Sequence, residues 1–220
     1  MAGQNEANLL QTAEDDRMNW SAWLPLALVC LLGAMSPGPS LAVVARHALR
    51  GGARAGIFCA VAHGIGILLW ALLMANGLGV LLIEQPDWFA AVQLAGAGFL
   101  LYLGIRVLLS QSSAVVSAEA MSHSSARGAG LEGFVIALSN PKIALFFAAL
   151  FSQFIQPDAT ALEKTLIAGT AAAIDTLWYS LVSALLAQTA VLSRLQRHAT
   201  LLNRLFGGIL IMLAVSVVMT

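Results

Sequence analysis

The sequence predicts an all-α membrane protein that crosses the bilayer six times. Hydrophobic residues make up 59% of its 220 residues and charged residues only 10%, whereas about a quarter of the residues in soluble domains are charged. The apolar residues fall in long runs, and a membrane-spanning helix needs roughly 20 of them. Six runs meet that length: about 22–45, 55–75, 88–109, 132–155, 165–190 and 201–219. A transmembrane barrel would show shorter, alternating segments.

The basic residues predict how these helices are oriented. Lys and Arg accumulate on the cytoplasmic side of membrane proteins. The connections between spans one and two, three and four, and five and six carry most of them: Arg46, Arg50, Arg54, Arg106, Arg127, Arg194, Arg197 and Arg204. The opposite side carries only Arg17 and Lys164. We therefore expect three cytoplasmic connections and both termini outside, in the periplasm.

Two irregular segments flank and divide the predicted helices. Residues 1–19 are polar and acidic, without the basic start of a signal peptide, and we expect a flexible tail in which Met18 is a second candidate start. Residues 111–130 are rich in Ser, Ala and Gly and are expected to form a cytoplasmic connector. Residues 20–220 then form a single transmembrane domain with halves of about 20–110 and 131–220, a 3+3 pseudo-repeat.

Several polar residues fall inside the predicted spans, at one common depth. An α-helix rises about 1.5 Å per residue. Counted from the nearest interfacial charge, Lys142, Asp175 and His63 lie roughly 14–16 Å deep, near the middle of the bilayer. The sequence SPGPS at 36–40 lies at a comparable depth. Since these residues come from four different helices, we expect them to line one polar cavity.

Two helix breaks belong to this group of residues. They are formed by Pro37, Gly38 and Pro39 in span one and by Asn140 and Pro141 in span four. Proline removes a backbone donor and interrupts a helix, and in lipid such a break is tolerated where the backbone faces protein or water. We expect the helix that restarts at Pro141 to present free amide groups and a positive dipole end beside Lys142, which would suit a carboxylate. Interrupted helices in corresponding positions of two halves are typical of secondary transporters.

Each of these residues also has a plainer interpretation. Proline and glycine occur in membrane helices as simple kinks, and His63 alone would fit a hydrogen-bonded core residue. Lys142 and Asp175 would both be tolerated in the membrane if they formed a structural ion pair with each other. The sequence leaves these alternatives open, as it does a homo-oligomer.

The cysteines and motifs argue against other classes of function. Cys30 and Cys59 both lie in the first half and form no C-x-x-C pair, whereas a thiol-redox carrier should pair cysteines at matching positions of both halves. An intramembrane metalloprotease would need H-E-x-x-H, which does not occur. A purely structural subunit fits poorly with two charges at the membrane centre. An intramembrane enzyme or thiol-redox carrier stays the alternative, but we expect no enzyme, metal site, cofactor or nucleic-acid partner.

Three stretches of the chain resemble one known family. They are LGAMSPGPSLAVVARHALRGGARAGIFCAVAHGIG at 32–66, LAGAGFLLYLGIRVLLS at 94–110 and GFVIALSNPKIALFFAALFSQFI at 133–155. P-G-P in span one, N-P-K in span four and a glycine-rich third span are together specific. They are similar to the lysine exporter / homoserine–threonine resistance (LysE/RhtB) family of bacterial amino-acid exporters, and the resemblance covers essentially everything after residue 20.

The resemblance implies a six-helix inner-membrane protein that expels amino acids or close derivatives, driven by the proton gradient. Its two signatures correspond to Pro37, Gly38 and Pro39 and to Asn140, Pro141 and Lys142. We expect a neutral amino acid as substrate, held at its carboxylate by Asn140, the restarted helix and Lys142. Asp175 would be the protonatable group, helped by His63. The expected partners are thus an amino acid, protons and the lipid bilayer.

Overall fold

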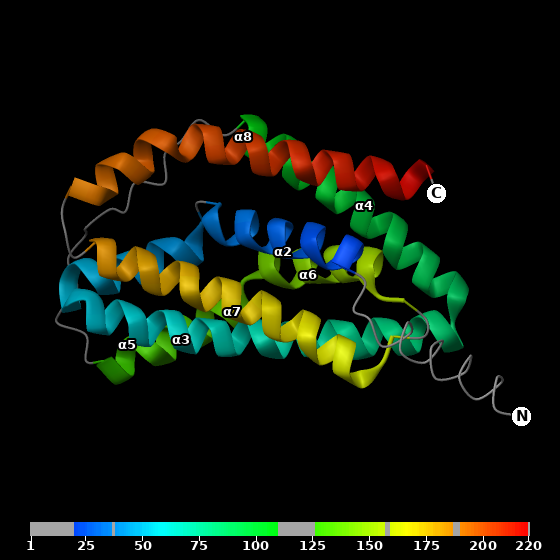
Figure 1. Ribbon diagram of the computed structural model, residues 1–220, viewed down its shortest axis with the longest axis horizontal. Coiled ribbons are helices and arrows are strands. Elements are labelled where there is room, and N and C mark those ends of the chain that lie inside the picture. Colours follow the sequence, from blue (N-terminus) through cyan, green and yellow to red (C-terminus); the bar gives the residue numbers. More distant parts are fainter. Residues whose placement is uncertain (1–19, 37, 110–125, 157–158, 187–189, 220) are drawn as a thin grey trace, which may run out of the picture.

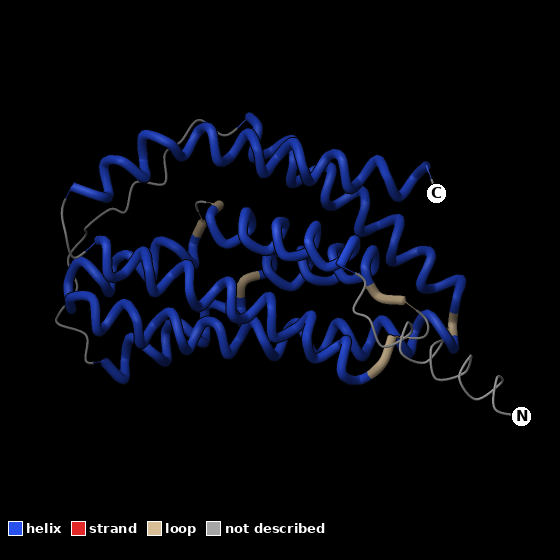
Figure 2. Tube along the Cα trace, in the orientation of Figure 1, coloured by secondary structure: helices blue, strands red, loops and turns tan. Residues whose placement is uncertain are grey.

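The residues that the structure describes form seven helices (Figures 1 and 2). The computed structural model describes residues 20–36, 38–109, 126–156, 159–186 and 190–219. The helices are α2 (Trp20–Met35), α3 (Pro39–Glu84), α4 (Pro86–Leu109), α5 (Ala126–Ser139), α6 (Pro141–Phe154), α7 (Ala161–Leu186) and α8 (Ala190–Met219). The predicted tail, Pro37 and most of the predicted connector lie outside the described residues. In the described part, the all-α prediction is confirmed.

Fewer helices than predicted qualify as membrane spans by length and hydropathy. Among the described residues, α3, α4 and α7 do so, and α5 with α6 forms a fourth candidate, bent by 55° at the break. The apolar parts of α2 (Trp23–Met35) and α8 (Asn203–Val217) are shorter. Part of the difference arises because the first predicted span is interrupted before Pro39 and because α3, with 46 residues, continues through a kink. Six spans therefore stay a prediction.

The kink in α3 lies at Gly52, whose φ of 74° and ψ of 176° are not helical. Glycine adopts a positive φ readily because it has no Cβ. The kink divides α3 into a first arm (39–51) and a second arm (53–84), and the chain reverses direction there (Figure 1). The connection predicted between the first two spans is thus a sharp helix reversal rather than a loop.

The helices form a layered bundle. α3, α5 and α7 pack together on one side, α4 and α8 pair on the other, and α2 and α6 lie between them (Figure 1). A Cβ atom added at Gly104 would lie 2.8 Å from the carbonyl oxygen of Gly207, so α4 and α8 approach backbone to backbone, as small residues permit in membrane helices. The largest apolar core fills the middle of the bundle and includes Phe151 and Phe206.

The ends of the bundle differ in what they contain. α2 begins and α8 ends at one end, whereas the kink of α3, the start of α5 and the end of α7 lie at the other (Figure 1). The second end therefore holds Arg46, Arg50 and Arg54 near the kink and Arg127 at the start of α5. Which end faces the cytoplasm stays a prediction from these basic residues.

Candidate functional site

A cavity of about 60 Å³ lies beside the two helix breaks. One water molecule needs roughly 10–15 Å³, so the space holds more than a single water. Its walls come from α2, both arms of α3, α6, α7 and α8. They include these residues singled out from the sequence: Gly38, Pro39, His63, Asn140, Lys142 and Asp175. Pro141 is exposed and does not line the cavity, and Pro37 lies outside the described residues.

Asn140 closes the break between α5 and α6. Its side-chain Oδ1 accepts a hydrogen bond from the backbone N–H of Lys142 at 3.0 Å, and its carbonyl oxygen accepts one from the N–H of Ile143, also at 3.0 Å. Pro141, the first residue of α6, has no N–H to offer. The expectation of free amide groups at this helix start is therefore wrong, because an Asn cap satisfies them within the turn. Asn140 Nδ2 instead donates to Ser40 Oγ at 3.4 Å.

Lys142 reaches from α6 toward the first break. Its Nζ donates a hydrogen bond to Ser36 Oγ at 3.4 Å and lies 6.0 Å from the centroid of the Phe206 ring. A Cβ atom at Gly38 would lie 3.7 Å from this ammonium group. The single positive charge among the lining residues thus lies against the backbone of the SPGPS segment, and it links the two breaks across the cavity.

Asp175 is paired with His63. The Asp175 Oδ2 atom lies 2.7 Å from His63 Nδ1, and the two side chains are 9% and 1% exposed. The His63 ring also packs edge-on against Tyr179, with the ring centroids 5.2 Å apart. Within the described part of the chain, His63 Nε2 is buried without a hydrogen-bond partner.

Lys142 and Asp175 do not form the ion pair that the sequence left open. Both residues are described, and no nitrogen-to-oxygen contact within 4.0 Å joins them. The carboxylate is bonded to His63 and the ammonium group to Ser36. The two charges therefore line the same cavity without neutralising each other directly, which leaves both able to meet a ligand.

Gly64 allows the His63–Asp175 pair to form. A Cβ atom there would lie 1.8 Å from Thr176 Oγ1 and 3.1 Å from Thr176 Cβ, so only glycine lets the second arm of α3 approach α7 this closely. We expect Gly64→Ala to separate the helices and destabilise the protein by about 1–3 kcal/mol, the usual cost of overpacking. Thermal unfolding of the purified protein in detergent measures this as a lower melting temperature.

Gly77→Ala is the matched control for this prediction. Gly77 lies in the same helix, and nothing comes within 4 Å of a Cβ added there. Since alanine has the higher helix propensity, this variant is expected to melt at the wild-type temperature or slightly above it. Equal melting of the two variants would show that the approach at Gly64 is not needed for packing.

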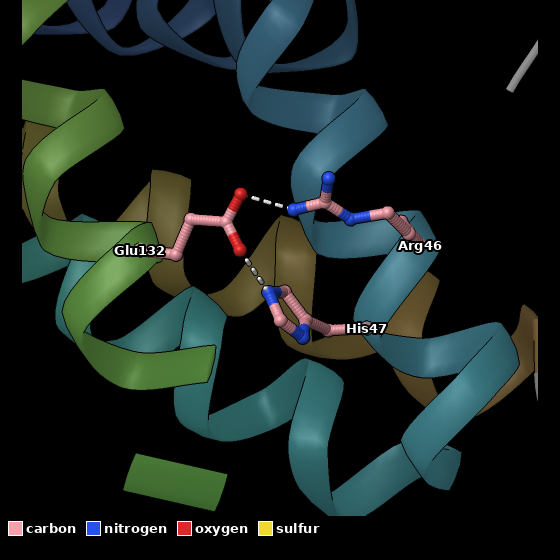
Figure 3. Close-up of polar contacts among 3 residues, drawn as sticks. All are labelled: Arg46, His47 and Glu132. Atoms are coloured by element: carbon pink, nitrogen blue, oxygen red, sulfur yellow. Dashed lines mark hydrogen bonds and ion pairs between the residues drawn. The ribbon is translucent and has the colours of Figure 1, made fainter. Parts of the chain in front are cut away.

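A second polar cluster lies outside the cavity, near the kink of α3 (Figure 3). Both carboxylate oxygens of Glu132 are engaged: Oε1 forms an ion pair with Arg46, and Oε2 lies 2.8 Å from His47 Nε2. From the sequence, Arg46 predicted only the orientation of the helices, and its pairing with Glu132 was not predicted. Opposite charges expected at the same membrane interface were the available signal.

Comparison with known proteins identifies the family. The family described as LysE type translocator matches residues 31–220. The chain belongs to this family. With its apolar helices, this LysE-type translocator is a multi-pass transporter of the bacterial inner membrane. No solved structure matches it.

Several curated bacterial proteins are similar to this LysE-type translocator over most of their length. A membrane protein of uncharacterized function from Vibrio cholerae serotype O1 is 29% identical over 193 residues, which cover 87% of this chain and 93% of that protein. The homoserine/homoserine lactone efflux protein of Salmonella typhi is 27% identical over 198 residues, with 87% and 93% covered. The threonine efflux protein of the same organism is 25% identical over 188 residues, with 84% and 91% covered.

Proposed function

We propose that the protein exports neutral amino acids or close derivatives across the inner membrane by antiport with protons. The observation that supports this most strongly is the cavity at the helix breaks, which contains one lysine and one carboxylate that are not bonded to each other. Relatives named for threonine and homoserine efflux agree with it. Broken helices around a polar site near the membrane midplane are a recurring design of secondary transporters.

The charge of the cavity favours a neutral amino acid. Such a substrate carries one carboxylate and one ammonium group, which match Lys142 and the Asp175–His63 pair. A basic amino acid would bring a second positive charge, and the described lining offers no second carboxylate for it. The rest of the wall is largely apolar: Cys30, Ile67, Ile143, Phe146, Phe147 and Phe206. This wall suits an uncharged side chain, because an unpartnered charge there would lose its hydration.

The Asp175–His63 pair is the candidate proton site. When His63 Nδ1 donates its proton to Asp175 Oδ2, the lone pair of Nε2 is left as an acceptor. In the described part of the chain no other group occupies that acceptor. A proton that arrives from the periplasm can be held by this pair, and its binding removes the negative charge that attracts the substrate ammonium group. Proton binding and substrate release are thereby coupled.

The proposed topology is the six-span, 3+3 arrangement with both termini in the periplasm. The start of α2 and the end of α8 at one end of the bundle agree with it (Figure 1). The helix contacts also agree: the second arm of α3 packs on α7 and α4 packs on α8, which correspond to spans two and five and spans three and six. Both breaks, before Pro39 and at Asn140, are followed by a proline that begins the next helix.

An efflux screen tests this function. The protein is expressed in a bacterial host that lacks its own amino-acid exporters, and each amino acid is supplied inside the cell as a dipeptide. We expect resistance to at least one neutral amino acid or its toxic analogue, a lower intracellular level of that compound, and loss of both effects when a protonophore collapses the gradient. An unchanged intracellular level of every amino acid, relative to cells with an empty vector, would contradict export.

A further inference from the structure

The cluster of Arg46, His47 and Glu132 joins the first arm of α3, which borders the cavity, to α5, which ends directly before the cavity-lining Asn140 (Figure 3). Arg46 and His47 lie in the first arm of α3, and Glu132 lies in α5. His47 is buried, with 3% of its side chain exposed, whereas Arg46 and Glu132 are exposed by 28% and 42%. The carboxylate therefore lies at the edge of the bundle and joins the two helices from there.

A buried apolar cluster lies beside this polar cluster on the same helices and on α7, and reaches the cavity at Tyr179; we call it the plug. It consists of Val44, Ala55, Cys59, Ala60, Ala129 and Tyr179. On the first arm of α3, Val44 lies between Ser40, which lines the cavity, and Arg46. On α5, Gly133 follows Glu132 directly, and a Cβ atom there would lie 2.3 Å from the carbonyl oxygen of Cys59. α5 therefore packs tightly on the second arm of α3 beside Glu132, while Glu132 itself is bonded to the first arm.

The plug and the polar cluster lie toward the arginine-rich end of the bundle. An exporter must take up its substrate from the cytoplasm, which is the side predicted for this end. The described conformation packs buried apolar side chains between that side and the cavity. Substrate loading consequently requires the first arm of α3 and α5 to separate at the plug, as in the rocking motion of alternating access.

We propose that Arg46, His47 and Glu132 form a latch that holds the cytoplasmic side of the cavity closed and opens for substrate loading. That the latch opens toward the cytoplasm for substrate loading rests on the proposed export function. The chemistry suits a reversible contact: an ion pair that is partly exposed contributes little net stability, because water competes for both charges. The latch can thus break and re-form in each cycle, while the plug excludes water when it is closed.

Cys30 provides a built-in reporter of the latch. The sequence contains two cysteines; Cys30 lines the cavity, and Cys59 belongs to the plug. In a Cys59→Ala background, which the reference protein and every variant share because Cys59 belongs to the plug, Cys30 is the single thiol. Inside-out membrane vesicles expose the cytoplasmic side to a small anionic methanethiosulfonate reagent that does not cross the bilayer. The labelling rate of Cys30 then measures how often the cavity opens to that side.

Glu132→Gln is expected to raise this labelling rate by roughly two- to fivefold, the factor that loss of a partly exposed ion pair allows. Arg46→Gln removes the other partner of the ion pair and is also expected to raise the labelling rate. It tests the latch if Glu132→Gln fails to insert into the membrane. Arg54→Gln is the matched control: Arg54 is exposed on the same arginine-rich end, and its removal should leave the rate unchanged.

Two outcomes would overturn the latch: labelling that does not respond to either latch variant, or labelling that rises equally from the periplasmic side of intact cells. Labelling of Cys30 is measured without substrate, so it tests the latch independently of the proposed export function. If labelling responds but no amino acid is exported, the latch stands and the substrate assignment fails. If export is established but labelling does not respond, the latch fails.

Discussion

Asp175→Asn is expected to reduce gradient-driven efflux to the level of cells without the transporter. Asn keeps the size of the side chain and can still bond to His63, but it cannot bind and release a proton. The variant should therefore lose the coupling step while it keeps exchange of labelled for unlabelled amino acid, since exchange moves no net proton. Uptake and release by everted vesicles, with and without an imposed pH gradient, measure the two activities separately.

Glu84→Gln is the control for Asp175→Asn. Glu84 ends α3 in an exposed position, and its replacement removes the same charge outside the cavity. Efflux by this variant should stay within about twofold of wild type, because surface substitutions away from packed sites change little. Both variants are compared at equal amounts of protein in the membrane. Normal efflux by Asp175→Asn would remove this carboxylate from the mechanism.

Several of the residues that line the cavity were singled out from the sequence, whereas Pro141 does not line it. Two prolines around a glycine, and an Asn–Pro step, disfavour a continuous helix, so the two breaks were predictable from the sequence, whereas the lone Pro25 lies within α2. The constant rise of a helix then placed Lys142, His63 and Asp175 at one depth. The depth of a residue in the bilayer can be predicted from the sequence because it follows from residue counting alone. An error of one helical turn still leaves the residue near the predicted midplane.

The pairing of these residues could not be predicted in the same way. A partner depends on the rotation of each helix about its axis, where one residue changes the direction of a side chain by about 100°. Asp175 therefore faces His63 rather than Lys142, although residue counting predicts one depth for all three. The close approach at Gly64, which sets this rotation, becomes visible only with Thr176 of α7 beside it.

Of two further features, one was predictable from the sequence and one was not. An Asn directly before a proline is the usual start of a helix, with Asn as the cap and proline as the first residue. The bonded amide of Lys142 was therefore predictable. The ion pair of Arg46 with Glu132 joins residues that are far apart in sequence, and a shared interface gives many such candidates, so only coordinates select this one.

Lys142→Met is expected to weaken substrate binding by roughly 10- to 150-fold, which corresponds to losing a hydrogen bond to a charged group of about 1.5–3 kcal/mol. Methionine keeps an unbranched, flexible stem but lacks the ammonium group that the proposal assigns to the substrate carboxylate. The half-saturating concentration in the exchange assay measures this loss. Because a partly buried charge is removed from apolar surroundings, the same variant should melt no lower than wild type.

Ser36→Ala separates this role from a purely structural one. Ser36 accepts the hydrogen bond of Lys142 in the described conformation, and the contact is long, at 3.4 Å. If Lys142 served only to tie α6 to the first break, removal of its acceptor would impair transport as much as removal of the lysine. If it binds substrate, Ser36→Ala keeps the charge in the cavity and should change the half-saturating concentration by no more than about fivefold, the effect of one ordinary hydrogen bond. Equal losses in the two variants, accompanied by lower melting temperatures, would assign Lys142 to the scaffold and leave the substrate carboxylate without its proposed partner.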